Sequence, residues 1–291
     1  MQRREFLTAG SATLLGLSAA ALHSAHAAKN EPKKPRKLLY FTRSVEYEHS
    51  VVSPGKDGIS FSGRVLKQLG KKVGFEIHPT KDGRVFDQDL DQYDAIVSFL
   101  CGDMFQPSVR KTPPMTAAGL KNLVDTVNAG KPFIGLHSAC YWGKTTHRAN
   151  SPYLTMVGAE FVQHGAQQEA TMRVVAPDFP GLSQLGRSFR KLDEWYAMKD
   201  FARDMHVVLV QETDGMKGAM YQRPPFPATW ARMHGKGRVF FTSMGHREDV
   251  WTGVPFQQVL LGGIAWALHD VDSDLSPNIE LVAPHAEQLK K

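Results

Sequence analysis

The chain has 291 residues, of which 42% are hydrophobic and 22% are charged, and its formal net charge is +6. Two cysteines cannot build a disulfide scaffold, and the length suffices for one large α/β domain, or two small ones, with a substantial core. Part of the basic excess lies in the Lys- and Pro-rich residues 29–37, and no basic helix studded with aromatic side chains follows. The composition therefore does not indicate nucleic-acid binding.

The first 27 residues have the pattern of an export signal. Arg3 and Arg4 precede a small apolar stretch at residues 14–22, and residues 25–27 (AHA) match an A-x-A cleavage site. The apolar stretch is well below the ~20 residues that cross a bilayer, so we expect a cleaved twin-arginine signal and a periplasmic protein without a membrane span. An uncleaved anchor is the alternative. Cleavage leaves 264 residues with a net charge of +5.

Strands and helices are expected to alternate in the first half of the mature chain. After a linker at residues 28–36, an α/β domain is predicted over 37–272, with a tail at 273–291. The expected strands are residues 38–42, 73–78, 95–100 and the run that leads into His137, and the expected helices are 59–71 and the segment from the cap Thr116 to Gly130. This order predicts a doubly wound, mostly parallel sheet with its site beyond the carboxyl ends of the strands.

The second half has a different pattern, with turns rather than full helices between strands. We expect a short helix at 151–158, strands at 170–175, 195–198 and 207–211, a connection at 181–190, a hairpin formed by 228–233 and 238–243, and a final helix at 255–268. These strands are predicted to add an antiparallel part to the parallel core.

One short stretch, residues 131–140 (KPFIGLHSAC), combines a buried-strand pattern with an abrupt stop. It predicts a strand that delivers His137 into a sharp turn, as a nucleophile elbow does. Cys140 follows this strand and Cys101 follows the preceding one, so both thiols lie beyond the ends of neighbouring strands. They could pair in an oxidising compartment, but two buried free thiols are the favoured interpretation.

Several motifs occur in an order that resembles the ThuA-like (trehalose utilisation) family. They are residues 135–139 (GLHSA), 158–164 (GAEFVQH), 193–196 (DEWY), Trp230 with 235–246 (GKGRVFFTSMGH), and 263–267 (GIAWA). The resemblance implies a class I glutamine amidotransferase-like fold and a link to sugar breakdown, of 3-keto glycosides made by a partner sugar dehydrogenase. Two departures are Phe179-Pro180, where relatives often have His-Pro, and Trp195 inside the Asp-Glu-x-Tyr element.

Glutamine hydrolysis itself is not expected. An amidotransferase uses a Cys nucleophile at the elbow, paired with a later His-x-Glu. Here the elbow position is His137, Cys140 comes three residues later, and His246-Arg247-Glu248 still reads His-x-Glu. The scaffold is therefore predicted to keep its site and to use other chemistry.

The candidate site is a group of histidines with a carboxylate at the predicted sheet edge. Imidazoles with Glu194 or Glu48 suit Zn²⁺ or a similar divalent ion, and the same histidines could instead act as acid and base. The expected metal ligands are His49, His137, His164 and His246, with His137, His246 and Glu194 as catalytic residues. The remaining histidines are expected at the surface or in the signal, except His78, which is expected to cap a strand.

Aromatic side chains near this edge suit a sugar cleft, which needs flat apolar faces beside polar groups. The predicted platforms are Tyr141, Trp142, Tyr196 and Trp230. The sequence thus favours an exported hydrolase, or lyase or hydratase, that acts on keto-glycosides. A non-catalytic periplasmic sugar-binding module and a purely structural interaction protein are the alternatives.

Overall fold

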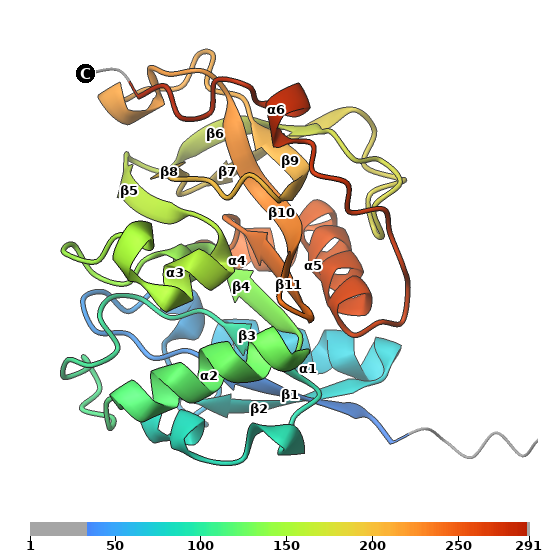
Figure 1. Ribbon diagram of the computed structural model, residues 1–291. Coiled ribbons are helices and arrows are strands. Elements are labelled where there is room, and N and C mark those ends of the chain that lie inside the picture. Colours follow the sequence, from blue (N-terminus) through green and yellow to red (C-terminus); the bar gives the residue numbers. More distant parts are fainter. Residues whose placement is uncertain (1–33, 290–291) are drawn as a thin grey trace, which may run out of the picture. The chain divides into compact units, whose positions relative to one another are not determined.

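The computed structural model describes residues 34–289, and the predicted signal and most of the linker lie outside this range. Its centre is a nine-stranded sheet in the order β2-β1-β3-β4-β11-β10-β9-β6-β7, and β5 pairs with β8 in a separate two-stranded sheet (Figure 1). The strands are β1 (Arg36–Phe41), β2 (Phe75–Thr80), β3 (Ala95–Ser98), β4 (Phe133–Leu136), β5 (Glu160–His164), β6 (Gln168–Val174), β7 (Ser188–Asp193), β8 (Tyr196–Lys199), β9 (His206–Gln211), β10 (Phe226–His234) and β11 (Gly237–Thr242).

The sheet changes from parallel to antiparallel at the hairpin of β10 and β11. Strands β2, β1, β3, β4 and β11 are parallel neighbours, whereas β11, β10, β9, β6 and β7 pair antiparallel. This arrangement confirms the predicted fold class, a mostly parallel sheet with antiparallel strands added in the second half. Because β1, β4 and β11 run in the same direction, the loops that follow them leave the sheet at one edge.

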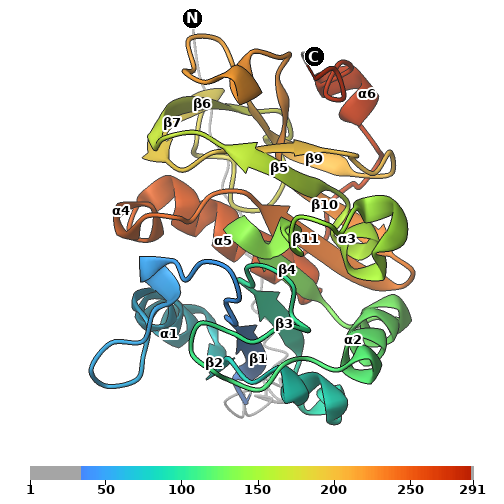
Figure 2. The same cartoon turned by 90° about the vertical axis from the view of Figure 1, so that its left-hand side faces the viewer.

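Helices cover both faces of the parallel part (Figure 2). They are α1 (Phe61–Val73), α2 (Ala117–Ala129), α3 (Pro152–Val157), α4 (Glu248–Trp251), α5 (Val254–Ala267) and α6 (Ile279–Val282). Helices α1 and α5 contribute to one buried apolar cluster, and α2 and α3 contribute to a second cluster on the opposite face. No helix within residues 34–289 is long and apolar enough to span a membrane.

Capping residues place the helices where the sequence predicts them. The Thr116 side chain accepts from the Gly119 N–H, and Gly130 ends α2. Ser151 caps α3 in the same way, and Gly158 ends it with a φ of 102°. These polar side chains and glycines satisfy the groups that a helix end leaves unpaired, so both predicted boundaries are confirmed.

Two boundaries differ from the prediction. Val73 and Gly74 end α1 instead of beginning the second strand, because Gly74 adopts the left-handed conformation that terminates helices. Pro79 does not stop β2, since β2 is an edge strand and needs no donor on its open side. In the second half, β7 occupies residues that were expected to form a connection.

The C-terminal segment predicted as a tail packs against the domain. The Asn278 side chain donates to the Val207 carbonyl at 3.0 Å and accepts from the Val207 N–H at 2.6 Å. Ile279, Ala283 and Ala286 are buried in the apolar cluster beneath them. This segment therefore adds to the core instead of extending into solvent.

Candidate functional site

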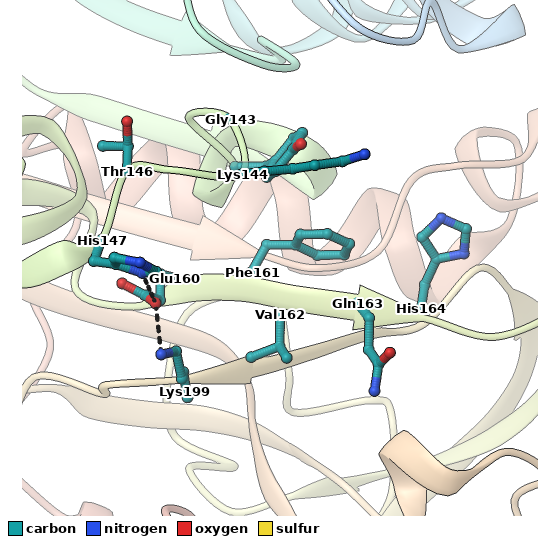
Figure 3. Close-up of a pocket in the computed structure, with 11 residues that line it drawn as sticks. Gly143, Lys144, Thr146, His147, Glu160, Phe161, Val162, Gln163, His164 and Lys199 are labelled. Carbon is teal, nitrogen blue, oxygen red and sulfur yellow. Dashed lines mark hydrogen bonds and ion pairs between the residues drawn. The ribbon is translucent and has the colours of Figure 1, made fainter.

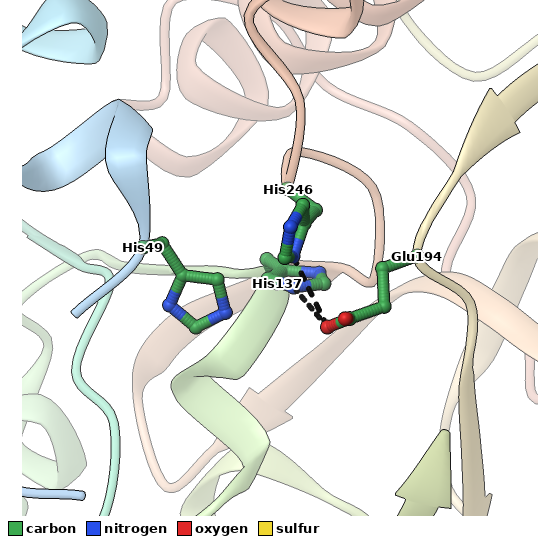
Figure 4. A group of neighbouring side chains, drawn as sticks. All are labelled: His49, His137, Glu194 and His246. Atoms are coloured by element: carbon green, nitrogen blue, oxygen red, sulfur yellow. Dashed lines mark ion pairs between the residues drawn. The ribbon is translucent and has the colours of Figure 1, made fainter. Parts of the chain in front are cut away.

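Four side chains from distant parts of the chain converge at the edge of the parallel sheet. His49 comes from the loop after β1, His137 directly follows β4, Glu194 follows β7, and His246 lies after β11 (Figure 4). One donor atom from each lies within 4.8 Å of all the others, and all four residues are buried. The predicted convergence of His49, His137, His246 and Glu194 is thus present in the structure.

His137 occupies the sharp turn that its sequence context predicts. Its backbone φ is +46°, which is rare for a residue with a Cβ, and it begins a 3-10 turn that ends at Cys140. The ring nitrogen Nδ1 lies 2.7 Å from the Ser243 carbonyl oxygen. Because a carbonyl only accepts, Nδ1 carries the proton, and in the neutral ring Nε2 presents a lone pair to the cluster.

That lone pair faces a carboxylate. His137 Nε2 is 3.6 Å from Glu194 Oε2, and no hydrogen bond satisfies it. Two electron-rich atoms directed at one another in a buried site are unfavourable unless a proton or a metal cation lies between them. The site thus has a place for a positive charge.

The other two histidines present one nitrogen each to the same group. His246 Nδ1 lies 3.1 Å from Glu194 Oε2 but is not aligned as a hydrogen bond. The His49 nitrogen that faces the group is Nε2 (Figure 4), which lies 3.5 Å from the Tyr196 hydroxyl. Burial lowers the pKa of His49 well below its ordinary value, and the neighbouring His137 and His246 lower it further. His49 is therefore neutral, which is the form that ligates metal ions.

Glu194 is the carboxylate that these histidines share. Burial alone would raise its pKa, but His137 and His246 hold the pKa well below its ordinary value, so the side chain is ionised. The His-x-Glu motif does not supply this partner, since Glu248 accepts instead from Ser50 Oγ at 2.6 Å. Glu48 is also excluded as a partner, because it pairs with Lys81 at 3.1 Å and with Arg110 at 2.6 Å.

His164 lies beside the cluster and not within it. Its Nδ1 is 3.3 Å from Glu194 Oε1, yet its side chain is 43% exposed and it is absent from the group of converging donors. The prediction that His164 is a fourth histidine ligand is corrected accordingly. Its position between Glu194 and the open cleft suits contact with a ligand.

A cleft of about 480 Å³ opens beside the cluster, and Tyr141 and Tyr196 both line it, with His49, His164 and Glu194. The Tyr196 hydroxyl lies 3.5 Å from His49 Nε2, and its ring lies 4.2 Å from that of His137. Burial raises the pKa of Tyr196 well above its ordinary value, so its phenol keeps its proton. Tyr196 can therefore donate to a ligand oxygen.

Two of the predicted platforms are core residues. Trp230 is fully buried, stacks on Phe241 at 4.3 Å and donates its Nε1–H to the Val157 carbonyl. Trp142 is 3% exposed and packs against Tyr153. Neither lines the cleft, so their prediction as sugar platforms is wrong. A packing aromatic and a binding aromatic have the same sequence pattern, and only their position relative to the cleft separates them.

Asp193 is a site residue that sequence reasoning did not select. Its Oδ2 accepts from the Gly245 N–H at 2.8 Å, and Trp251 Nε1 donates to the Gly245 carbonyl at 2.8 Å. Both backbone groups of the residue before His246 are therefore fixed. The signal available in the sequence was the adjacency of Asp193 to Glu194, which also fits an ordinary strand end.

The two positions at which this sequence departs from the ThuA-like pattern, Phe179 and Trp195, do not line the cleft. Phe179 is buried against Phe240 and Trp266 in the α5 cluster. Trp195 is buried too, and its Nε1 donates to the Gln168 carbonyl at 2.8 Å. Cys101 and Cys140 are buried free thiols, and burial raises the pKa of both. Cys140 is thus a poor nucleophile.

Comparisons with known proteins agree with this architecture. A ThuA-like protein of Bacteroides uniformis ATCC 8492 has a TM-score of 0.61 at 19% identity, over 86% of this chain and 98% of its own. One of Parabacteroides merdae ATCC 43184 has a TM-score of 0.60 at 17% identity, over 84% and 95%. At these identities the likeness shows the fold, which is glutamine amidotransferase-like as predicted.

A β-galactosidase of Bacillus circulans sp. alkalophilus shares this fold more distantly. Its TM-score is 0.50 at 11% identity, over 83% of this chain and 32% of its own. No curated protein matches the sequence. The family model for ThuA, described as trehalose utilisation, matches residues 37–267. Since that match covers most of the sequence, the chain belongs to the ThuA family.

Proposed function

We propose that this protein is an exported enzyme of carbohydrate breakdown that acts on keto-sugars, in particular 3-keto glycosides or disaccharides. The observation that carries the proposal is the convergence of three imidazoles on one ionised carboxylate at the edge of a cleft, with unsatisfied buried nitrogens of His137 and His246 facing that carboxylate. Buried polar atoms are rarely left without partners in a folded protein, and exceptions gather at functional sites.

The donor set suits a divalent cation such as Zn²⁺. His49, His137, His246 and Glu194 offer three nitrogens and one oxygen, and the backbone carbonyl that accepts from His137 Nδ1 is a typical partner of a metal-ligating histidine. Donors ~2.1 Å from one ion are at most ~4.2 Å apart, so the 4.8 Å spread requires only a small inward rotation of the side chains. When bound, such an ion would polarise a sugar carbonyl or lower the pKa of a water molecule.

The protein's own side chains have separate tasks in this proposal. Ser243 fixes the tautomer of His137, so that Nε2 faces the cluster. Glu194 is ionised and can ligate or accept a proton, and Tyr196 is protonated and can donate to a substrate oxygen. His164 and Tyr141 bound the same cleft. This combination suits hydration, elimination or hydrolysis next to a ketone.

The family description supports a sugar as the substrate. A ketone must be formed before this site can act on it, so a sugar dehydrogenase is the proposed partner in the same pathway. The twin-arginine pattern at Arg3 and Arg4 supports export to the periplasm.

Turnover of a 3-keto glycoside by the purified protein tests the proposal. His137→Ala and His246→Ala should each lower kcat/KM by at least ~100-fold, because each removes a group from the reacting centre. His285→Ala is the matched control, since His285 is exposed at the far C-terminal segment. Saturable glycoside binding without any product would indicate the sugar-binding module instead, and unchanged turnover in His137→Ala would refute the proposed site.

A further inference from the structure

A second cavity, of about 440 Å³, adjoins the cleft at the histidine cluster (Figure 3). The two cavities share four lining residues, which are Tyr141, Lys144, Phe161 and His164. Together they form a cleft that follows β5 from Glu194 at one end to Glu160 at the other. The binding surface is thus longer than the candidate catalytic centre requires.

An irregularity in β5 shapes this cleft. Phe161 is opposite Met198 and Gln163 is opposite Ala197, so Val162 is an additional residue in the strand. Residues three apart on a regular strand point to opposite faces, but the bulge restores Phe161 and His164 to the same face. Figure 3 shows the two rings on one side of β5, with Val162 and Gln163 directed to the other.

The far end of the cleft is a charged network around a buried carboxylate. The Glu160 side chain is 4% exposed, and Lys199 Nζ and His147 Nδ1 lie 3.0 and 3.1 Å from its Oε1. Lys199 is 31% exposed, and its Nζ also lies 3.6 Å from Asp200 Oδ2. Burial alone would raise the pKa of Glu160, but the Arg148 N–H and Lys199 lower it, so the network holds a fixed charge pattern.

Lys144 lies over the middle of this cleft and lines both cavities. Among residues 34–289 no hydrogen bond or ion pair occupies its ammonium group. In Figure 3 its side chain extends above the Phe161 ring toward His164. An ammonium donor and an aromatic ring in the same cavity are a combination that holds a sugar ring, since hydroxyls accept from the ammonium while the apolar ring face packs on the aromatic.

We propose that this second cavity is a subsite for the leaving part of the substrate, a second neutral sugar ring, so that the protein selects disaccharide-sized glycosides. The inference rests on the proposed function, because the first ring is taken to lie at the histidine cluster. Lys144 would donate to the hydroxyls of the second ring, and Phe161 would support its apolar face.

Calorimetric titration with unoxidised sugars tests this subsite without any turnover. Trehalose should bind the wild type more tightly than methyl glucoside. Lys144→Met should weaken trehalose binding about tenfold and methyl glucoside binding clearly less, because the hydrogen bond to the second ring is lost only with the larger ligand. Lys144→Arg should retain most of the affinity. Lys121→Met, at an exposed lysine of α2, is the control.

Equal losses for both sugars, no loss for either, or no binding of trehalose to the wild type would overturn the subsite. The two proposals fail separately in this design. Loss of trehalose selectivity in Lys144→Met with no turnover of keto-glycosides would support the subsite and refute the proposed reaction, whereas turnover without selectivity would do the reverse.

Discussion

His137 is the residue at which backbone strain and the candidate chemistry coincide. A left-handed conformation costs a residue with a Cβ about 1–2 kcal/mol, and His137 adopts it at a φ of +46°. Strain of this kind persists where the surroundings enforce it, and here it directs a buried imidazole at Glu194. The strain therefore agrees with a functional role for the turn.

The strain at His137 predicts an unusual ranking of variants. Both His137→Gly and His137→Ala remove the imidazole, but only glycine relieves the backbone cost. His137→Gly should be more stable than His137→Ala by about 1 kcal/mol. Urea denaturation in a chelating buffer measures the difference. Equal midpoints for the two variants, or a more stable alanine variant, would show that the turn is not strained.

His49 predicts a pH dependence of stability. Its pKa is lowered in the folded protein, chiefly by burial and then by His137 and His246, so the unfolded chain binds a proton at His49 that the folded chain does not. The free energy of unfolding should therefore fall as the pH drops below about 6.5, the ordinary histidine value, until the pH reaches the folded pKa. Glu194, whose pKa is also lowered, adds a loss of the same sign below about pH 4.3.

The contribution of His49 is isolated by comparison with His49→Gln in metal-free buffer. Other histidines with lowered pKa values, such as His234 and His269, remain in both proteins and cancel. The wild type should lose more stability than the variant between pH 6.5 and 5, as measured by thermal denaturation. Parallel curves over that range would contradict a neutral His49.

At the scale of single residues, the sequence indicated which side chains reach the sheet edge but not which of them meet. His49, His137 and His246 follow parallel strands. Loops that follow the carboxyl ends of parallel strands meet at one edge of the sheet, which brings these three residues together. The choice of Glu194 over Glu48, the outward position of His164 and the burial of Trp230 depend on contacts between segments far apart in the chain. Local patterns contain no information on such contacts.

At the scale of elements, helix boundaries that are set by local capping residues were predictable. Thr116 and Gly130 bound α2 because capping is a local interaction, whereas β7 and the bulge in β5 depend on pairing with distant strands. The boundary between α1 and β2 at Gly74, which differs from the prediction, is an intermediate case. Glycine after a helix signals a C-cap, but the β-branched Val73 before it also fits the start of a strand.

Close packing of α5 gives a prediction at this scale. A Cβ on Gly262 would lie 1.8 Å from the Pro180 carbonyl oxygen, so the helix approaches the preceding loop where no side chain fits. Gly262→Ala should destabilise the protein by about 2 kcal/mol or more, although alanine favours helices by about 1 kcal/mol over glycine.

The control for this prediction is Lys121→Ala on the exposed surface of α2, which should change stability by less than about 0.5 kcal/mol. Guanidinium denaturation measures both variants. A Gly262→Ala variant as stable as the wild type would show that α5 can move away from the loop at little cost.

At the scale of the whole molecule, the proposed export predicts that the chain leaves the cytoplasm by the twin-arginine route. Replacing both arginines, as Arg3→Lys with Arg4→Lys, keeps the charge but removes the pair that the route recognises. The variant should stay in the cytoplasm at full length, while the wild type should appear in the periplasm with Ala28 at its amino terminus.

Fractionation followed by amino-terminal sequencing checks both statements. Export of the double variant at the wild-type level would contradict the twin-arginine route. A periplasmic protein that still begins at Met1 would instead indicate an uncleaved anchor. The sequence alone supplies this prediction, because residues 1–33 lie outside the part that the structure describes.

We propose that His49, His137, His246 and Glu194 together hold one divalent cation. Elemental analysis of the folded, exported protein tests it most directly, beside His137→Ala, His246→Ala and the control His285→Ala. We expect close to one equivalent of a single divalent metal in the wild type and in His285→Ala, and strong depletion in the two site variants. A wild type without stoichiometric metal, or equal metal content in all four proteins, would contradict it.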